Sequence, residues 1–295
     1  MPLGPIKRLS LSLATINLAR ILKKTQAEKI VWENGDNILC ESAINLKCLN
    51  TICDPNSAER QNIHNMDQTD FDSLKAAVSK LVDQKIIHTT VDIQEITGLA
   101  ASGSDIAKRR TMEEFLQKDC AGFYEPTEHN FQANYEHKQI RAIHEPNSEN
   151  LMMFGWNTKL YLANAGGSHH FACLRHIASE LDRSVPITSN MLLQALNRDA
   201  VSAFNQDYSF YLFNSSIHYS LISEFIESQN LPSYTCCINI PSSQIGLLFL
   251  QKDHWQLSQS SDSAIKDVLT DFGSELTKLV SIQENNQQFQ TYWSR

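Results

Sequence analysis

The sequence lacks a long apolar run. No stretch of about 18 apolar residues occurs in its 295 residues, so a transmembrane helix is not expected. Serines, Asn17 and Arg20 interrupt the apolar residues near the N-terminus, and no clean cleavage site follows them. A secretory signal is therefore not expected either.

Positive charge and paired cysteines are also scarce. Lysine and arginine number 25 against 33 aspartates and glutamates, a net charge of −8. This balance argues against a protein that coats nucleic acid, because neutralising phosphates needs a basic face. The seven cysteines are an odd number and form no CxxC pair. Cys40, Cys48 and Cys53 have no matching histidine or cysteine pair to complete a zinc site, so we expect reduced thiols in a cytoplasmic protein and no metal centre.

What is present is an ordinary globular composition, with 42% hydrophobic and 20% charged residues. The chain is long enough for one large domain, or one domain with an appendage. Residues 1–66 are predicted to be an accessory region. Its first 24 residues contain five basic residues, no acid and interspersed leucines and isoleucines. This pattern predicts an amphipathic helix that packs on the body of the protein, or alternatively one that binds a membrane surface or a protein partner.

The rest of the accessory region is predicted to hold a hairpin that turns at Asn34-Gly35, followed by a polar loop over 53–70. Residues 67–283 then follow an α/β rhythm, and 284–295 are predicted to be a loose tail. Strands are predicted at 89–96, 140–144, 151–156, 159–163, 185–188, 208–213, 235–240 and 245–250. Helices are predicted at 71–84, from 104 or 105 through 116, and at 131–137, 169–181, 191–204, 216–227 and 261–282.

The most informative segment is 159–177, KLYLANAGGSHHFACLRHI. A short apolar strand passes through Gly166-Gly167 into a helix that opens with Ser168, His169 and His170. Glycines let backbone N–H groups approach a ligand closely, and the free N–H groups and dipole of a helix start favour negative charge. The segment therefore indicates an anion-binding site with two histidines as donors or proton carriers.

Three interpretations of the histidines remain open from the residues alone. The first is phosphate or nucleotide binding at the helix start. The second is a metal site from His169, Cys173 and His176, which share a helix face but lack a further ligand at matching spacing. The third is structural, with the histidines satisfied locally.

Two arginines are candidate phosphate ligands. Arg109 and Arg110 lie in a basic run, which is commonly a solvated helix face. Guanidinium groups nevertheless match phosphate geometry, so one of them is expected to reach an anion held at the glycine turn.

The run from LMMFGW through NTKLYLANAGGSHHFACLRHIA to VPIT resembles the ParB/sulfiredoxin-like superfamily, and TTVDIQEI resembles the strand that opens its domains. Members place a Gly-x-His-Arg-type motif between a strand and a helix, and sulfiredoxins carry Gly-Gly-Cys-His-Arg. The resemblance covers about residues 88–190. The rest of the chain resembles uncharacterised bacterial proteins that share the Gly-Gly-Ser-His-His run.

By this resemblance Gly166, Gly167 and His169 fall on the motif. Ser168 stands where sulfiredoxins have their catalytic cysteine, so sulfinic-acid reduction is not expected. His170 stands where arginine is usual, and Arg109 or Arg110 would have to compensate.

The sequence thus predicts a mixed α/β fold with a ParB/sulfiredoxin-like core and a nucleotide-dependent enzyme of phosphoryl transfer or phosphate hydrolysis. Gly166, Gly167 and Ser168 would cradle the phosphate, with His169 and His170 as candidate catalytic residues. A nucleoside triphosphate with Mg²⁺ is the expected ligand. The alternatives are a non-catalytic nucleotide-gated switch or partner-binding protein and, less compatible with the charge, a metal-dependent nuclease.

Overall fold

The chain folds into two compact units that are interleaved along the sequence. A computed structural model describes residues 4–25, 38–39, 46, 49, 52–53, 59–120, 122–240 and 243–295. The hairpin predicted at Asn34-Gly35 lies outside the described residues. Unit 1 comprises Met1–Trp32, Leu46–Val82 and Leu196–Val280, and unit 2 comprises Glu33–Asn45, Asp83–Ala195 and Ser281–Arg295.

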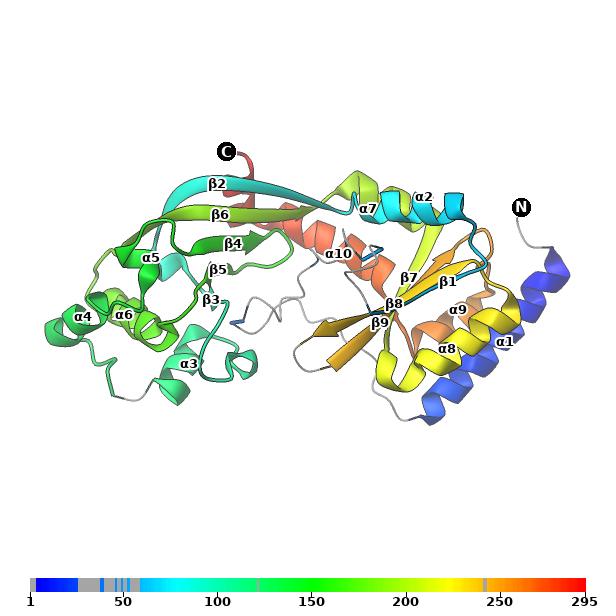
Figure 1. Ribbon diagram of the computed structural model, residues 1–295, viewed down its shortest axis with the longest axis horizontal. Helices are drawn as coiled ribbons and strands as arrows, with labels where there is room; N and C mark the ends of the chain where they lie inside the picture. The colour runs from blue at the N-terminus through cyan, green and yellow to red at the C-terminus, as the bar shows by residue number, and fades with distance from the viewer. Residues whose placement is uncertain are drawn as a thin grey trace. The chain divides into compact units, whose positions relative to one another are not determined.

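Unit 1 is built on a five-stranded sheet of order β1-β8-β9-β7-β10, in which neighbouring strands run antiparallel (Figure 1). Its strands are β1 Glu59–His64, β7 Tyr208–Asn214, β8 Ser233–Ile240, β9 Ser243–Gln251 and β10 Thr270–Asp271. Its helices are α1 Pro5–Lys24, α2 Gln68–Val78, α7 Arg198–Asp207, α8 Ser215–Gln229, α9 Gln259–Lys266 and the first part of α10 Phe272–Asn285.

The helix predicted at the N-terminus packs on unit 1, which confirms that expectation. Leu11, Leu18 and Leu22 of α1 are buried in one cluster with apolar residues of α8, α9 and the sheet. On strand β7, Tyr211 and Phe213 belong to this cluster. Phe210, which alternates with them, stacks on Phe249 at a centroid distance of 4.2 Å. The sheet of unit 1 therefore buries apolar side chains of both strand faces.

Three sequence predictions in unit 1 are wrong. Residues 59–64 of the predicted loop form β1, because they pair with the distant strand β8. The helix predicted over 191–204 begins only at Arg198, since the residues before it extend strand β6, Pro186–Leu196. The single helix predicted over 261–282 is two helices separated by β10, which pairs with β7.

Unit 2 contains a mixed sheet of order β2-β6-β4-β5-β3 (Figure 1). β4 runs parallel to β6 and antiparallel to β5, and β3 runs parallel to β5. Besides β6, its strands are β2 Val82–Asp92, β3 Gly98–Leu99, β4 Asn150–Phe154 and β5 Leu160–Ala163. Its α-helices are α3 Met112–Asp119, α4 Glu128–Tyr135, α5 Arg141–His144, α6 Ser168–Glu180 and α11 Gln287–Trp293, with short 3-10 turns η2 Ile93–Glu95 and η3 Ile106–Lys108. The predicted mixed α/β class is confirmed.

Helix α6 is held by its apolar face. Phe171, Leu174, Ile177 and Ala178 recur at helical spacing and are at most 1% exposed in the core of unit 2. The strand β5 before it and the helix itself occupy the residues that the sequence predicts. The loop between them is consequently fixed at both ends.

Other predictions in unit 2 need correction. The strand predicted over 140–144 is the short helix α5, and the helix predicted from 104 or 105 is the turn η3 followed by α3, which Thr111 caps. The tail predicted to be loose carries α11, with Phe289 fully buried and Asn286 donating to the carbonyl oxygens of Gly155 and Asn157. These contacts come from residues far apart in sequence, which local patterns do not reveal.

None of the helices in the described part of the chain is both long and apolar enough to cross a membrane.

Candidate functional site: the loop and pocket at the start of α6

Asn164 fixes the loop that leads into α6. Its Oδ1 accepts hydrogen bonds from the backbone N–H groups of Ala100 and Ala101, both at 3.1 Å. Its Nδ2 donates to the carbonyl oxygens of Ala101 at 2.9 Å and Gly166 at 3.1 Å. One buried amide thus joins the loop to the segment that follows β3.

Glu149 supports the same loop from inside the protein. Its carboxylate accepts the backbone N–H of Ala165 at 2.7 Å and that of Ala142 at 3.2 Å. The residue is 4% exposed, and burial raises the pKa of its carboxyl above the usual range although the two hydrogen bonds act in the opposite direction. Sequence reasoning missed Glu149 and Asn164, because neither belongs to the glycine-histidine motif.

The two glycines have different roles. Gly167 has φ +68°, and a Cβ there would lie 2.6 Å from the carbonyl oxygen of Gln139, so only glycine fits without strain. Gly166 has nothing within 4 Å of the position of a Cβ. Gly167 therefore shapes the turn, and Gly166 leaves space beside it.

The N-terminus of α6 opens on a pocket. Gly167 caps the helix without a side-chain hydrogen bond, and the first intrahelical bond runs from the N–H of Phe171 to the oxygen of Gly167. The N–H groups of Ser168, His169 and His170 come before that bond, so they make no hydrogen bond within the helix. The pocket has a volume of about 670 Å³ and is lined by Ala101, Ser102, Gly103, Asp119, Cys120, Phe123, Gln139, Ala165, Gly166, Gly167, Ser168, His169, His170 and Cys173.

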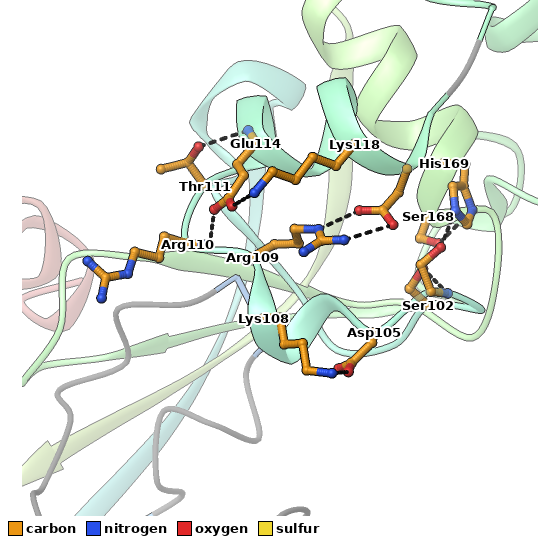
Figure 2. A network of polar contacts seen from close by, with 12 residues as sticks. Ser102, Asp105, Lys108, Arg109, Arg110, Thr111, Glu114, Lys118, Ser168 and His169 are labelled. Atoms are coloured by element: carbon orange, nitrogen blue, oxygen red, sulfur yellow. Dashed lines mark hydrogen bonds and ion pairs between the residues drawn. The ribbon is translucent and has the colours of Figure 1, made fainter.

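His169 lies between serine hydroxyls (Figure 2). Its Nε2 is 2.9 Å from Ser104 Oγ, and its Nδ1 is 3.4 Å from Ser168 Oγ. The hydroxyl of Ser168 donates to Ser102 Oγ at 2.8 Å. Because the Ser168 proton is used in that bond, Ser168 Oγ can only accept a hydrogen bond from His169. The imidazole proton is therefore assigned to Nδ1, and Nε2 accepts the proton of Ser104. Sequence reasoning missed Ser102 and identified Ser104 only as a helix start.

His170 is held as a neutral ring. Asn134 donates through Nδ2 to the carbonyl oxygens of Phe123 and Asn130, so its Oδ1 faces His170 Nδ1 at 2.9 Å. His170 stacks on His137 with centroids 3.5 Å apart. Burial, then the neighbouring His137 and His169, lower the pKa of His170. Its Nδ1 therefore carries the proton, and Nε2 keeps a lone pair.

Neither predicted arginine lines the pocket. Arg109 makes a bidentate pair with Asp119, at 2.6 Å from Nε to Oδ2 and 3.2 Å from Nη2 to Oδ1, and this hydrogen bonding raises the pKa of Arg109 and lowers that of Asp119. Arg110 is exposed, and Figure 2 shows its side chain extending away from His169. The structure thus brings together Gly166, Gly167, Ser168, His169 and His170 and sets Arg109 and Arg110 apart from them.

Two thiols belong to the same pocket. Cys120 and Cys173 are buried, and Cys120 Sγ donates to the backbone oxygen of His169 at 3.8 Å. The hydrogen bond between the two thiols, together with burial, raises the pKa of Cys120. We therefore expect Cys120 to remain a thiol at neutral pH.

The side chains around this pocket, in the part of the chain that the structure describes, do not fit a resident metal ion. Asp119 is already bound to Arg109, and His176 packs edge-on against Tyr124. No group of three or more His, Cys, Asp or Glu side chains in the described segments could hold a metal.

The model of one protein family, described as a family of unknown function (DUF6685), matches residues 86–288. Comparison with curated proteins and comparison with solved structures each give no match. The ParB/sulfiredoxin-like resemblance of the motif stays a prediction.

Proposed function

The chain belongs to the family of unknown function DUF6685, and we propose that it binds the phosphate group of a nucleotide in the pocket at the start of α6. The observation that carries this proposal is the N-terminus of α6, which lacks a side-chain cap and opens beside Gly166 into that pocket. Helix geometry leaves three N–H groups there, with a partial positive charge of about half a unit. A phosphate oxygen supplies the acceptors that these groups lack.

Arg109 supports the proposal indirectly. Asp119 lines the pocket, and an unpaired carboxylate there would repel a phosphate. The two hydrogen bonds from Arg109 offset that charge, and both side chains are at most 20% exposed. Arg109 therefore preserves the preference of the pocket for anions without touching the ligand.

We further propose phosphoryl transfer or phosphate hydrolysis as the reaction. A water or alcohol oxygen would attack phosphorus, and the bond to the leaving oxygen would break. The neutral His170 is one candidate proton carrier, since its Nε2 can accept a proton from the attacking oxygen or return it to the leaving one. His169 would do the same once the Ser104 hydroxyl turns away from its Nε2. Mg²⁺ enters this proposal only as the counter-ion that a nucleoside triphosphate brings with it.

Replacement of Gly166 by aspartate tests the phosphate site. The new carboxylate has open space but would repel phosphate, so Gly166→Asp should weaken binding of ATP, CTP, GTP or pyrophosphate by about tenfold or more in calorimetry. Gly4→Asp is the matched control, because it makes the same change at another glycine with nothing within 4 Å. It should bind as the wild type does.

The outcomes separate the candidate functions. Equal affinity in Gly166→Asp and wild type contradicts the site, and no binding of any phosphate compound contradicts the proposal and favours a partner-binding protein. Binding without release of phosphate favours the nucleotide-gated switch. Release of phosphate that is lost in His169→Ala supports the enzyme.

A further inference from the structure

The outward side of α1 exposes large aliphatic side chains over about two turns. Ile6 is 86% exposed, Leu9 63% and Leu13 60%. Their spacings of three and four residues place them on one helix face. They form a continuous apolar stripe, which differs from the scattered apolar residues common on protein surfaces.

This stripe is independent of the helix's own packing. Leu11, Leu18 and Leu22 on the opposite side are at most 6% exposed and belong to the core of unit 1. They hold α1 in place without the exposed residues. The apolar stripe is therefore available to contact another surface. Because the opposite side of α1 is buried in unit 1, that surface can contact α1 only from its outward side.

The charge of α1 identifies the kind of surface. The helix carries five basic residues and no acidic one, in a chain with net charge −8. Lys23 pairs with Asp267 at 2.8 Å, and Arg8 lines a pocket of unit 1. Lys7, Arg20 and Lys24 are exposed. Arg20 and Lys24 extend the line of Ile6 and Leu13 along the helix, at intervals of seven and four residues.

We propose that the outward face of α1 docks on an anionic lipid bilayer. The aliphatic side chains enter the interface between headgroups and acyl chains, and Arg20 and Lys24 contact lipid phosphates. Two copies of this face would bring like charges together, which disfavours self-association. The helix lies along the membrane surface, because its other side stays in the core of unit 1.

Co-sedimentation of the full chain with vesicles tests this docking. Vesicles of phosphatidylcholine with added phosphatidylglycerol should bind the protein, and vesicles of phosphatidylcholine alone should bind it much less. Leu9→Gln/Leu13→Gln should lower partitioning onto the vesicles by about tenfold or more, since binding then transfers two fewer aliphatic side chains out of water. Ile86→Gln, at a residue of β2 that is 69% exposed, is the matched control and should bind as the wild type does.

A separate variant tests whether binding needs the basic side chains of α1. Arg20→Gln/Lys24→Gln should reduce binding to the anionic vesicles and make it less dependent on salt. The circular dichroism of all variants should equal that of the wild type, because every altered side chain is exposed.

Three results would overturn the proposal. One is no binding to anionic vesicles, and another is equal binding by Leu9→Gln/Leu13→Gln. The third is light scattering that shows a dimer which Leu9→Gln/Leu13→Gln dissociates while vesicles stay unbound, and this result would assign the face to a second copy. None of these outcomes depends on the phosphate pocket.

Discussion

At the scale of single residues, the candidate site depends on one glycine with an unusual backbone conformation and on a few side chains that accept or donate backbone hydrogen bonds. Gly167 adopts a conformation that other residues resist, and Glu149 and Asn164 satisfy the backbone of the loop. The sequence predicted the segment from Gly166 to His170 as a candidate site, because a glycine pair before a helix has a known physical meaning. It did not reveal Ser102, Ser104 and Glu149, which reach the motif only through the fold.

Glu149→Gln should lower the free energy of unfolding by about 1–3 kcal/mol. The amide has a single acceptor oxygen, so its NH₂ group would face one of the two N–H groups that the carboxylate now accepts. Urea unfolding measures the change. The control is Glu145→Gln, which removes an exposed pair with Arg141 at 3.2 Å and should cost less than about 0.5 kcal/mol. Equal effects of the two changes would contradict the assigned role of Glu149.

His170 should make the protein less stable in mild acid. Burial holds its folded-state pKa below the usual histidine value of about 6.5, so the unfolded chain takes up the proton first as the pH falls below about 6.5. Stability then declines with falling pH, and the buried His218, with a lowered pKa, adds to the decline. Urea unfolding from neutral pH to about pH 5 should show a shallower decline in His170→Gln than in wild type. The exposed His129 is the control position, and an unchanged slope in His170→Gln would refute the assignment.

At the scale of elements, the sequence predicted α6, β4, β5, β7, α8, β8 and β9 well, since each has a clear apolar period. The sequence prediction was wrong where one apolar pattern is compatible with both a helix and a strand. The run Met191-Leu192-Leu193 fits a buried helix or a buried strand, and parallel pairing with β4 decides for the strand. Tertiary contacts also order α11, although its composition suggests a loose end.

Phe289→Ala tests the packing of α11. The side chain is fully buried in the core of unit 2, so its loss should reduce the free energy of unfolding by about 3–5 kcal/mol. Thermal and urea unfolding both report this change. Phe123→Ala, at a ring that is 60% exposed, controls for the loss of an aromatic side chain and should cost far less. A neutral Phe289→Ala would restore the prediction of a loose tail.

At the scale of the whole molecule, we propose that an acidic chain binds anions at two surfaces in different ways. The pocket of unit 2 relies on backbone N–H groups and a helix dipole, with Asp119 neutralised by Arg109. The face of α1 in unit 1 relies on lysine, arginine and aliphatic side chains. Sequence composition predicted the basic helix but not which of its side chains remain exposed, because burial depends on the elements that pack against it.

The most direct test of the central claim is a titration of ¹⁵N-labelled protein with pyrophosphate, followed by the amide resonances. The account predicts saturable shifts of Ser168, His169 and His170, with little change at Ser216 and Ile217 of α8, another helix that has no side-chain cap. Shifts of equal size at both helices, or none at α6, would contradict a phosphate site at the start of α6.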